Sequence, residues 1–125
     1  MPAIVMVVDD DANTRRLLQF ILTNAGYNVV EATDGRDALE KLETIRADLI
    51  ILDVLMPNLD GLTTMRQMRM TPHLADLPVI FLSSRADVAA EYAGLAAGAR
   101  QYLVKPFSVP ALLQHVSDLL VTPTG

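Results

Sequence analysis

The chain has 125 residues, 10 of them basic and 15 acidic, and its net charge of −5 argues against direct contact with a nucleic-acid backbone or an acidic protein surface. This length fits one domain, and a content of 51% apolar residues allows one sizeable core. The chain has no cysteine, which excludes a disulfide framework and a thiolate metal site, and it has no apolar run of the roughly 20 residues that cross a bilayer, so we expect a cytoplasmic protein.

Five short apolar runs, rich in β-branched residues, are spaced along the chain and predict β-strands. In chain order they are Ile4–Val8, Asn28–Glu31, Leu49–Leu52, Val79–Leu82 and Gln101–Val104. The central runs are almost continuously apolar, which is typical of strands that are covered on both faces of a parallel sheet.

A segment of helical period follows each of these runs. The first has apolar residues at helical spacing and is expected to end at Gly26. These apolar residues are Leu17, Leu18, Ile21, Leu22 and Ala25. The second begins with Asp34 and Asp37, whose spacing resembles a capping box. Its expected inward stripe is Ala38, Leu39, Leu42 and Ile45.

The last three helices are indicated in the same way. Ser84 and Asp87 are spaced to cap a fourth, alanine-rich helix, and Ser108 precedes a fifth helix that has Pro110 in its first turn. The apolar stripe of the third helix is Leu62, Met65 and Met68. The inward side chains expected for the fifth are Leu112, Leu113, Val116, Leu119 and Leu120.

Five consecutive strand–helix units predict an α/β fold with a parallel sheet and helices on both faces, because right-handed crossovers place them there. We expect the doubly wound, flavodoxin-like (βα)5 arrangement with strand order 2-1-3-4-5. Residues 1–121 are assigned to this domain, and residues 122–125 to a tail or the start of a linker. In such sheets ligands bind beyond the carboxyl ends of the strands.

Polar side chains follow four of the five predicted strands. They are Asp9, Asp10 and Asp11 after the first strand, Asp53 after the third, Ser83 after the fourth and Lys105 after the fifth. Each one alone has a plain structural explanation, such as a helix cap, a turn or a solvated loop. Neighbouring strands lie about 4.8 Å apart, however, so the predicted strand order gathers all of them around one crevice.

The gathered groups suit the transfer of a phosphoryl group to a carboxylate. Mg²⁺ prefers oxygen ligands, typically one or two carboxylates together with waters and a phosphate oxygen. A cation there would relieve the repulsion between the carboxylates. Asp53 would be the nucleophile that forms an acyl phosphate, while Ser83 donates a hydrogen bond to a phosphoryl oxygen and Lys105 neutralises another.

At these residues the chain resembles the receiver domain of response regulators in two-component signalling, including the chemotaxis regulators. The motifs that carry the resemblance are VVDDD after the first run, DVLMPNLDG around Asp53, LSSRA after the fourth run and YLVKPF in the fifth. They cover essentially the whole chain in the order and spacing of that family. The resemblance implies a phosphorelay protein whose phosphoryl donor is a histidine kinase, a phosphotransfer protein or a small phosphodonor.

The resemblance also implies a role for each acidic residue. Asp53 accepts the phosphoryl group. Mg²⁺, or Mn²⁺ in its place, is held directly by Asp10, Asp53 and the backbone carbonyl of Leu55. Asp9 contributes through a metal-bound water. Asp11 lies one residue beyond the acidic pair of the family, and we assign it to helix capping.

The remaining implied roles concern the phosphoryl oxygens and the switch. Ser83 and Lys105 bind these oxygens, and the Lys105–Pro106 peptide bond is expected to be cis. Ser83 moves inward after phosphorylation, and Tyr102 turns into the vacated space. The alternative for Tyr102 is an ordinary strand-edge tyrosine with a solvated hydroxyl.

The resemblance places the output surface on the fourth helix, the fifth strand and the fifth helix. There a downstream domain or protein binds, and homodimers form. We expect no binding of nucleic acid or membrane by this domain. We also expect no enzymatic activity beyond its own phosphorylation and a slow autodephosphorylation, because neither Leu55 nor Arg85 offers a group suited to activating a water.

Three other interpretations are open. A haloacid-dehalogenase-like phosphatase would use Asp9 and Asp11 in its first-strand motif, but it leaves Asp53 and the KPF sequence unexplained. A flavin-binding flavodoxin needs a phosphate loop after the first strand, where three aspartates would repel a phosphate. An interaction module of the same shape that is never phosphorylated would not need the complete polar set.

Overall fold

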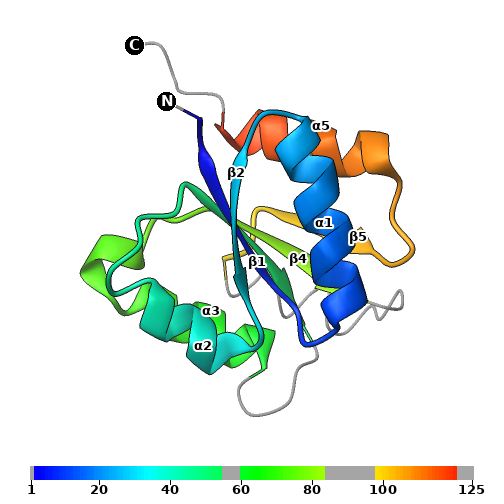
Figure 1. The fold of residues 1–125 in the computed structure, drawn as a ribbon. Coiled ribbons are helices and arrows are strands. Elements are labelled where there is room, and N and C mark those ends of the chain that lie inside the picture. Colours follow the sequence, from blue (N-terminus) through cyan, green and yellow to red (C-terminus); the bar gives the residue numbers. More distant parts are fainter. Residues whose placement is uncertain (1, 55–59, 84–97, 121–125) are drawn as a thin grey trace.

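The computed structural model describes residues 2–54, 60–83 and 98–120, which form one parallel sheet covered by helices (Figure 1). The strands are β1 (Ile4–Val8), β2 (Asn28–Ala32), β3 (Leu49–Asp53), β4 (Val79–Ser83) and β5 (Gln101–Val104). The helices are α1 (Ala12–Asn24), α2 (Gly35–Lys41), α3 (Gly61–Arg69) and α5 (Val109–Leu120), with a short 3₁₀ turn, η1, at Pro72–Leu74. Each predicted strand is present, and its bounds agree with the prediction to within one residue.

The strands lie in the order β2-β1-β3-β4-β5, and all four neighbouring pairs are parallel. The prediction of a doubly wound, flavodoxin-like sheet is therefore confirmed. All carboxyl ends of the strands lie at one edge of this sheet, because every pair is parallel.

Alternate residues of each strand supply two separate cores, one on each face of the sheet. One core, which contains Met6, Ile50 and Phe81, is covered by α2 and α3. The other, which contains Val7 and Ile51, is covered by α1 and α5. Figure 1 shows the two helix pairs on opposite sides of the sheet. This double cover explains why the central runs are almost continuously apolar.

The buried stripe of α1 is narrower than its set of apolar residues at helical spacing. Leu17 is 51% exposed, whereas Leu18, Ile21 and Leu22 are buried. Ile21 already lies at the edge of the buried stripe, with 8% exposure, and Leu17 lies one turn before it, farther from the sheet.

The predicted helix ends are found where the structure describes them. Gly26 follows α1 with φ at +97°, a conformation that favours glycine. Asp34 caps α2 by accepting a hydrogen bond from the backbone N–H of Asp37 at 2.8 Å. Asp37 in turn accepts a hydrogen bond from the backbone N–H of Thr33 at 3.0 Å. Ser108 accepts a hydrogen bond from the backbone N–H of Ala111.

Two other predictions fall outside the described residues. One concerns Ser84 and Asp87, the predicted cap of a fourth helix, and the other concerns residues 122–125, the predicted tail.

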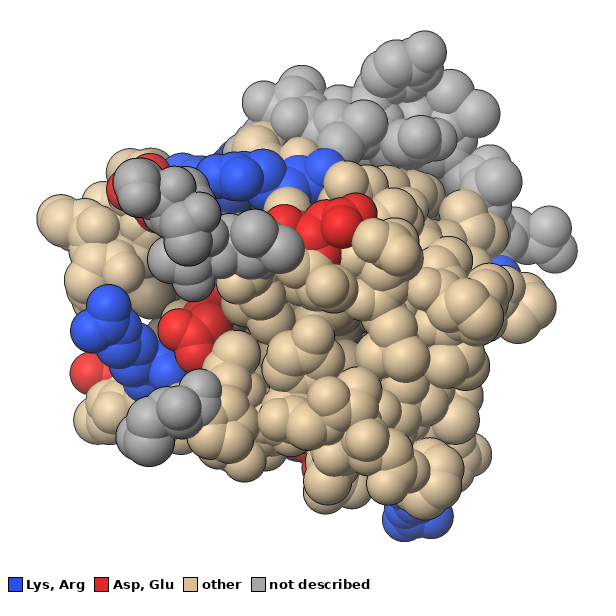
Figure 2. Space-filling model, turned by 90° about the horizontal axis from the view of Figure 1, so that it is seen from above, with Lys and Arg blue, Asp and Glu red and all other residues tan. Residues whose placement is uncertain are grey.

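None of the helices within residues 2–54, 60–83 and 98–120 is long and apolar enough to cross a bilayer. On the face shown in Figure 2, most of the basic and acidic side chains gather toward one side, and the rest of the described surface there is largely neutral.

Candidate functional site

The register of the strands brings the predicted site residues to one edge of the sheet. Val8 of β1 is paired with Leu52 of β3, so the residues that follow them, Asp9 and Asp53, lie at the same level. Asp53 is itself paired with Leu82 of β4. In the same way, Ser83 is paired with Val104 of β5, and Lys105 follows directly.

Three carboxylates meet at this edge. One oxygen each from Asp9, Asp10 and Asp53 lies within 4.8 Å of the others. Asp9 is fully buried and Asp53 is 5% exposed, whereas Asp10 is exposed to solvent. The cluster is therefore open to solvent at Asp10 and enclosed at Asp9. Oxygen donors at this spacing fit a hard divalent cation.

Asp9 is held by four separate contacts. Its backbone N–H donates to the carbonyl of Ala32 at 3.2 Å, and its own carbonyl accepts from Nη1 of Arg15 at 2.7 Å. Its Oδ1 accepts from the backbone N–H of Asp11 at 2.9 Å, and its Oδ2 accepts from Nζ of Lys105 at 2.6 Å. Every polar group of this buried residue thus has a protein partner, as burial requires.

Lys105 provides the positive charge of the site. Its Nζ lies 2.6 Å from Oδ2 of Asp9 and 3.6 Å from Oδ2 of Asp53. Burial alone would lower the pKa of Lys105, but the hydrogen bond to Asp9 and the charge of Asp53 outweigh burial and raise this pKa above its ordinary value. The ammonium group is therefore charged at neutral pH. The peptide bond between Lys105 and Pro106 is cis.

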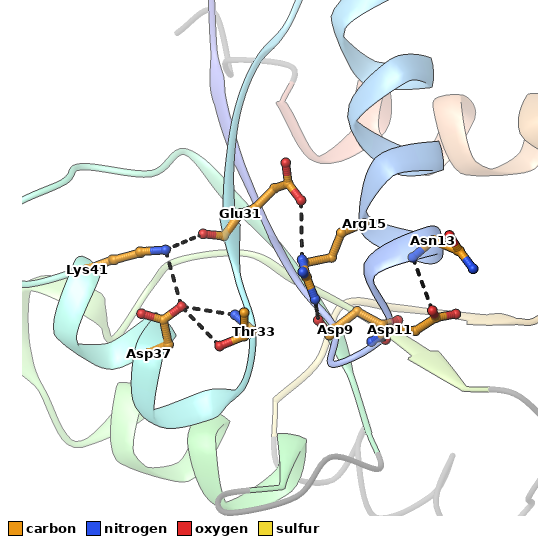
Figure 3. Close-up of polar contacts among 8 residues, drawn as sticks. All are labelled: Asp9, Asp11, Asn13, Arg15, Glu31, Thr33, Asp37 and Lys41. Atoms are coloured by element: carbon orange, nitrogen blue, oxygen red, sulfur yellow. Dashed lines mark hydrogen bonds and ion pairs between the residues drawn. The ribbon is translucent and has the colours of Figure 1, made fainter.

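Asp11 caps helix α1, as predicted. Its Oδ1 accepts from the backbone N–H of Asn13 at 3.1 Å, a contact drawn in Figure 3, and its Oδ2 accepts from the Thr14 hydroxyl at 2.8 Å. The hydrogen bonds from Thr14 and Asn13 lower the pKa of this carboxyl. Asp11, the third aspartate of the triplet, therefore caps helix α1 and is not part of the carboxylate cluster.

Helix α3 begins directly against the end of β3. The backbone N–H of Gly61 donates to the carbonyl of Val54 at 3.0 Å, and Asp60 caps the helix by accepting from the N–H of Thr63 at 2.7 Å. A Cβ atom at Gly61 would collide with the backbone carbonyl oxygen of Asp53. Glycine at this position therefore lets the helix approach the strand end that carries Asp53.

Tyr102 lies on β5 and is half-buried, with its ring packed against the core that α2 and α3 cover. Its hydroxyl oxygen is buried and has no hydrogen-bond partner among the described residues. The solvated hydroxyl of the alternative interpretation is therefore not found. The side chain of Ser83, and all of Leu55 and Arg85, lie outside the described residues.

A hollow of about 640 Å³ lies away from the carboxylate cluster, at the amino edge of the sheet. It is lined by the loop between α2 and β3, including Arg46 and Asp48, and by residues around η1, including His73. The only described group of three or more potential metal-binding side chains is the aspartate cluster at the carboxyl edge. The candidate metal site among the described residues therefore lies at the carboxyl edge and not in this hollow.

Sequence reasoning did not single out Gly61 or Arg15. Gly61 stands at the end of the DVLMPNLDG motif, and its position just after Asp60 was a signal that could have been used. Arg15 had no such signal, because its contact is with a backbone carbonyl whose direction no sequence pattern gives.

Comparison with known proteins agrees with this geometry. Residues 5–117 match the family described as the response regulator receiver domain. Response regulator MprA of Mycolicibacterium vanbaalenii is 46% identical over 120 residues, which are 96% of this chain and 51% of that protein. The chain thus spans about half the length of the curated relatives that it matches.

Two solved structures are similar over nearly the whole chain. Chemotaxis protein CheY4 of Vibrio cholerae has a TM-score of 0.90 and 36% identity, covering 96% of this chain and 100% of that one. Response regulator protein TrrA of Thermotoga maritima, in complex with Mg²⁺–BeF, has a TM-score of 0.84 and 33% identity. The latter similarity covers 94% of this chain and 99% of that one.

Proposed function

The chain belongs to the receiver domains of two-component response regulators, and on that premise we propose that Asp53 accepts a phosphoryl group in a Mg²⁺-dependent reaction. One observation supports this most directly: oxygens of Asp9, Asp10 and Asp53 lie within 4.8 Å of one another, with the Lys105 ammonium beside two of them. The site therefore has carboxylate ligands for a cation, and one of these carboxylates, Asp53, can act as a nucleophile next to that cation.

The phosphoryl step needs an oxygen nucleophile and a leaving group. A carboxylate oxygen of Asp53 attacks phosphorus, and the bond from phosphorus to the donor breaks, leaving an acyl phosphate. With a phosphohistidine donor, the bond that breaks is P–N, and the imidazole nitrogen keeps the electron pair. Lys105, placed by β5, neutralises a phosphoryl oxygen, and the hydroxyl of Ser83 donates a hydrogen bond to another.

The proposed ligands of the ion are Asp10, Asp53 and the backbone carbonyl of Leu55, with Asp9 acting through a water. Mg²⁺, or Mn²⁺, would offset the charge that builds up between the carboxylates and the phosphoryl group. The donor set fits such an ion, since it consists of carboxylate oxygens and is open to solvent at Asp10. The Mg²⁺–BeF complex of the similar Thermotoga regulator supports the same assignment.

The partners follow from the same proposal. A histidine kinase, a phosphotransfer protein or a small phosphodonor supplies the phosphoryl group. A downstream domain or protein binds the surface of the predicted fourth helix, β5 and α5, where a homodimer also forms. Tyr102 and Ser83 carry the switch, and the unpartnered hydroxyl of Tyr102 supports this role, because such a group gains a hydrogen bond when it moves.

We further propose that the domain turns over no external substrate and loses its phosphoryl group slowly. It acts in the cytoplasm and has no direct contact with nucleic acid or membrane. The acidic charge balance supports the lack of nucleic-acid contact.

Treatment with acetyl phosphate and Mg²⁺ tests the acceptor. We expect intact-mass spectrometry to show one added phosphoryl group on the wild-type chain and none on Asp53→Ala. Asp48→Asn is the matched control, because Asp48 precedes the opposite end of the same strand, and this variant should be labelled normally. Labelling should disappear when Mg²⁺ is removed with a chelator.

Other outcomes would contradict the proposal. A wild-type chain that remains unlabelled would favour the interaction module that is never phosphorylated. Continuous hydrolysis of a phosphate ester would favour the phosphatase. Loss of label within seconds would contradict the slow autodephosphorylation.

A further inference from the structure

We infer that Arg15 of α1 is a positioning residue for the carboxylate cluster: by holding the backbone carbonyl of Asp9, it fixes the orientation of Asp10 for the cation. This inference rests on the proposed function of the cluster. Arg15 acts through the backbone: the hydrogen bonds described for its side chain go to the carbonyl of Asp9 and to Glu31.

The guanidinium of Arg15 joins two segments of the sheet. Its Nη1 donates to the carbonyl of Asp9 at 2.7 Å, and its Nε donates to Oε1 of Glu31 on β2 at 3.2 Å. Figure 3 shows Arg15 lying between Glu31 and the end of β1. The side chain is 16% exposed, so solvent competes little for these contacts.

Glu31 is in turn fixed by helix α2. Nζ of Lys41 donates to the backbone carbonyl of Glu31 at 2.6 Å and lies 3.2 Å from Oδ2 of Asp37 (Figure 3). Arg15 is thus supported by β2, which helix α2 holds through Lys41. This makes the guanidinium a rigid donor rather than a mobile surface group.

The carbonyl that Arg15 holds belongs to the peptide between Asp9 and Asp10. Because a peptide unit is planar, fixing this carbonyl also fixes the direction of the N–H of Asp10. The carboxylate of Asp10 is exposed and makes no hydrogen bond or ion pair with other described residues. What the fold fixes of Asp10 is therefore its backbone, from which the carboxylate extends toward the cluster, and Arg15 helps to hold that backbone.

Charge and positioning predict opposite effects of removing Arg15. Loss of a positive charge close to a carboxylate cluster should tighten the binding of a cation, if charge alone matters. Loss of the hydrogen bond to Asp9 should loosen the orientation of Asp10 and weaken binding. The sign of the change in Mg²⁺ affinity therefore decides between the two.

The experiment compares Arg15→Gln and Arg15→Lys with the wild type, with Arg16→Gln as the matched control. Arg16 is the next residue of α1 and is exposed, so its replacement removes the same charge without the contact. Calorimetric titration with Mg²⁺ gives the Kd. We expect a Kd about tenfold weaker for Arg15→Gln, at the lower end of the effect of residues that orient metal ligands, and no weakening for Arg16→Gln.

A second readout separates positioning from a general loss of structure. Labelling by acetyl phosphate should be impaired in Arg15→Gln at low Mg²⁺ and should recover at saturating Mg²⁺. Arg15→Lys keeps the charge and is the safer variant for folding, and its Kd should lie between those of the wild type and Arg15→Gln. Adding Glu31→Gln to Arg15→Gln should cause no further weakening, because Glu31 acts through Arg15.

The inference would be overturned if Arg15→Gln bound Mg²⁺ as tightly as the wild type or more tightly. If the glutamine variant does not fold, an unchanged Kd for Arg15→Lys would overturn it. If the wild-type chain bound no Mg²⁺ and Asp53 were never labelled, the proposed function would fail instead. The two failures are therefore distinguishable.

Discussion

Asp9 shows at the scale of a single residue how an acidic group is kept inside this protein. A buried carboxylate is costly unless a charge and hydrogen bonds compensate it. The Lys105 ammonium at 2.6 Å supplies the charge, and the N–H of Asp11 supplies a second donor. Lys105 is thus part of the fold as well as part of the proposed chemistry.

Replacing Lys105 with methionine should leave the buried Asp9 carboxylate without its counter-ion. We expect the free energy of unfolding to fall by about 2–3 kcal/mol, somewhat less than for a fully buried pair. Mg²⁺ should restore part of this loss, because a cation in the cluster offsets the same negative charge. Urea unfolding followed by circular dichroism, with and without Mg²⁺, measures both effects.

Arg16→Met is the control for that variant, since Arg16 is exposed on α1 and its loss should not change the response to Mg²⁺. A Lys105→Met chain as stable as the wild type without Mg²⁺ would contradict the prediction.

Helix α2 illustrates what the sequence reveals at the scale of an element. The spacing of Asp34 and Asp37 predicted the cap, because an N-cap bond to the third residue of a helix is local. The partner of Asp37 was not predictable in the same way, since Thr33 and Lys41 both contact its Oδ2. The exposure of Leu17 was not predictable, because periodicity gives the direction of an apolar stripe but not its width.

The contacts of Asp37 make the contribution of helix α2 to stability dependent on pH. Burial alone would raise the pKa of Asp37, but the Thr33 N–H and the Lys41 ammonium together lower it below its ordinary value. A lowered pKa in the folded state gives stability that is present above the ordinary value and lost as pH falls through the lowered one. The cap of α2 should therefore weaken in acid.

We expect Asp37→Asn to be less stable than the wild type at pH 7, with a difference that shrinks as the pH falls from the ordinary pKa of an aspartate through the lowered pKa of Asp37, where the wild-type carboxyl becomes protonated. Urea unfolding at several pH values measures this difference. Asp118→Asn is the control, because Asp118 is exposed on α5 and accepts a hydrogen bond from the neighbouring turn only. A difference that is constant over this range would show that the charge of Asp37 is not involved.

At the scale of the whole molecule, one sheet separates two cores that contain different side chains. Five strand–helix units with right-handed crossovers allow more than one strand order, and the resemblance to receiver domains is what singles out 2-1-3-4-5. That order alone brings Asp9 and Asp53 together from distant parts of the chain. The contact between Arg15 and the carbonyl of Asp9 was not predictable, because it depends on how α1 packs against β2.

The shared sheet should make the two cores unfold together. Phe81 is fully buried in the core under α2 and α3, and Leu18 in the core under α1 and α5. We expect Phe81→Ala to lower the free energy of unfolding by about 3–5 kcal/mol and Leu18→Ala by about 2–5 kcal/mol, as for other large-to-small changes in cores. Each variant should still show one transition, with circular dichroism and tyrosine fluorescence coincident.

Phe20→Ala serves as the comparison for this pair, since Phe20 is 66% exposed on α1 and its loss should change stability little. Two separate transitions in either core variant would show that the faces of the sheet unfold independently.

The four contacts of Asp9 have a thermodynamic consequence. The rotational freedom of this side chain is already lost when the chain folds, so an arriving ion has no further entropy to remove there. Because Asp9 is held in place before an ion binds, ion binding at the aspartate cluster depends on an intact structure at the carboxyl end of β1. Any change that loosens that end should therefore lower ion affinity well before the molecule as a whole melts.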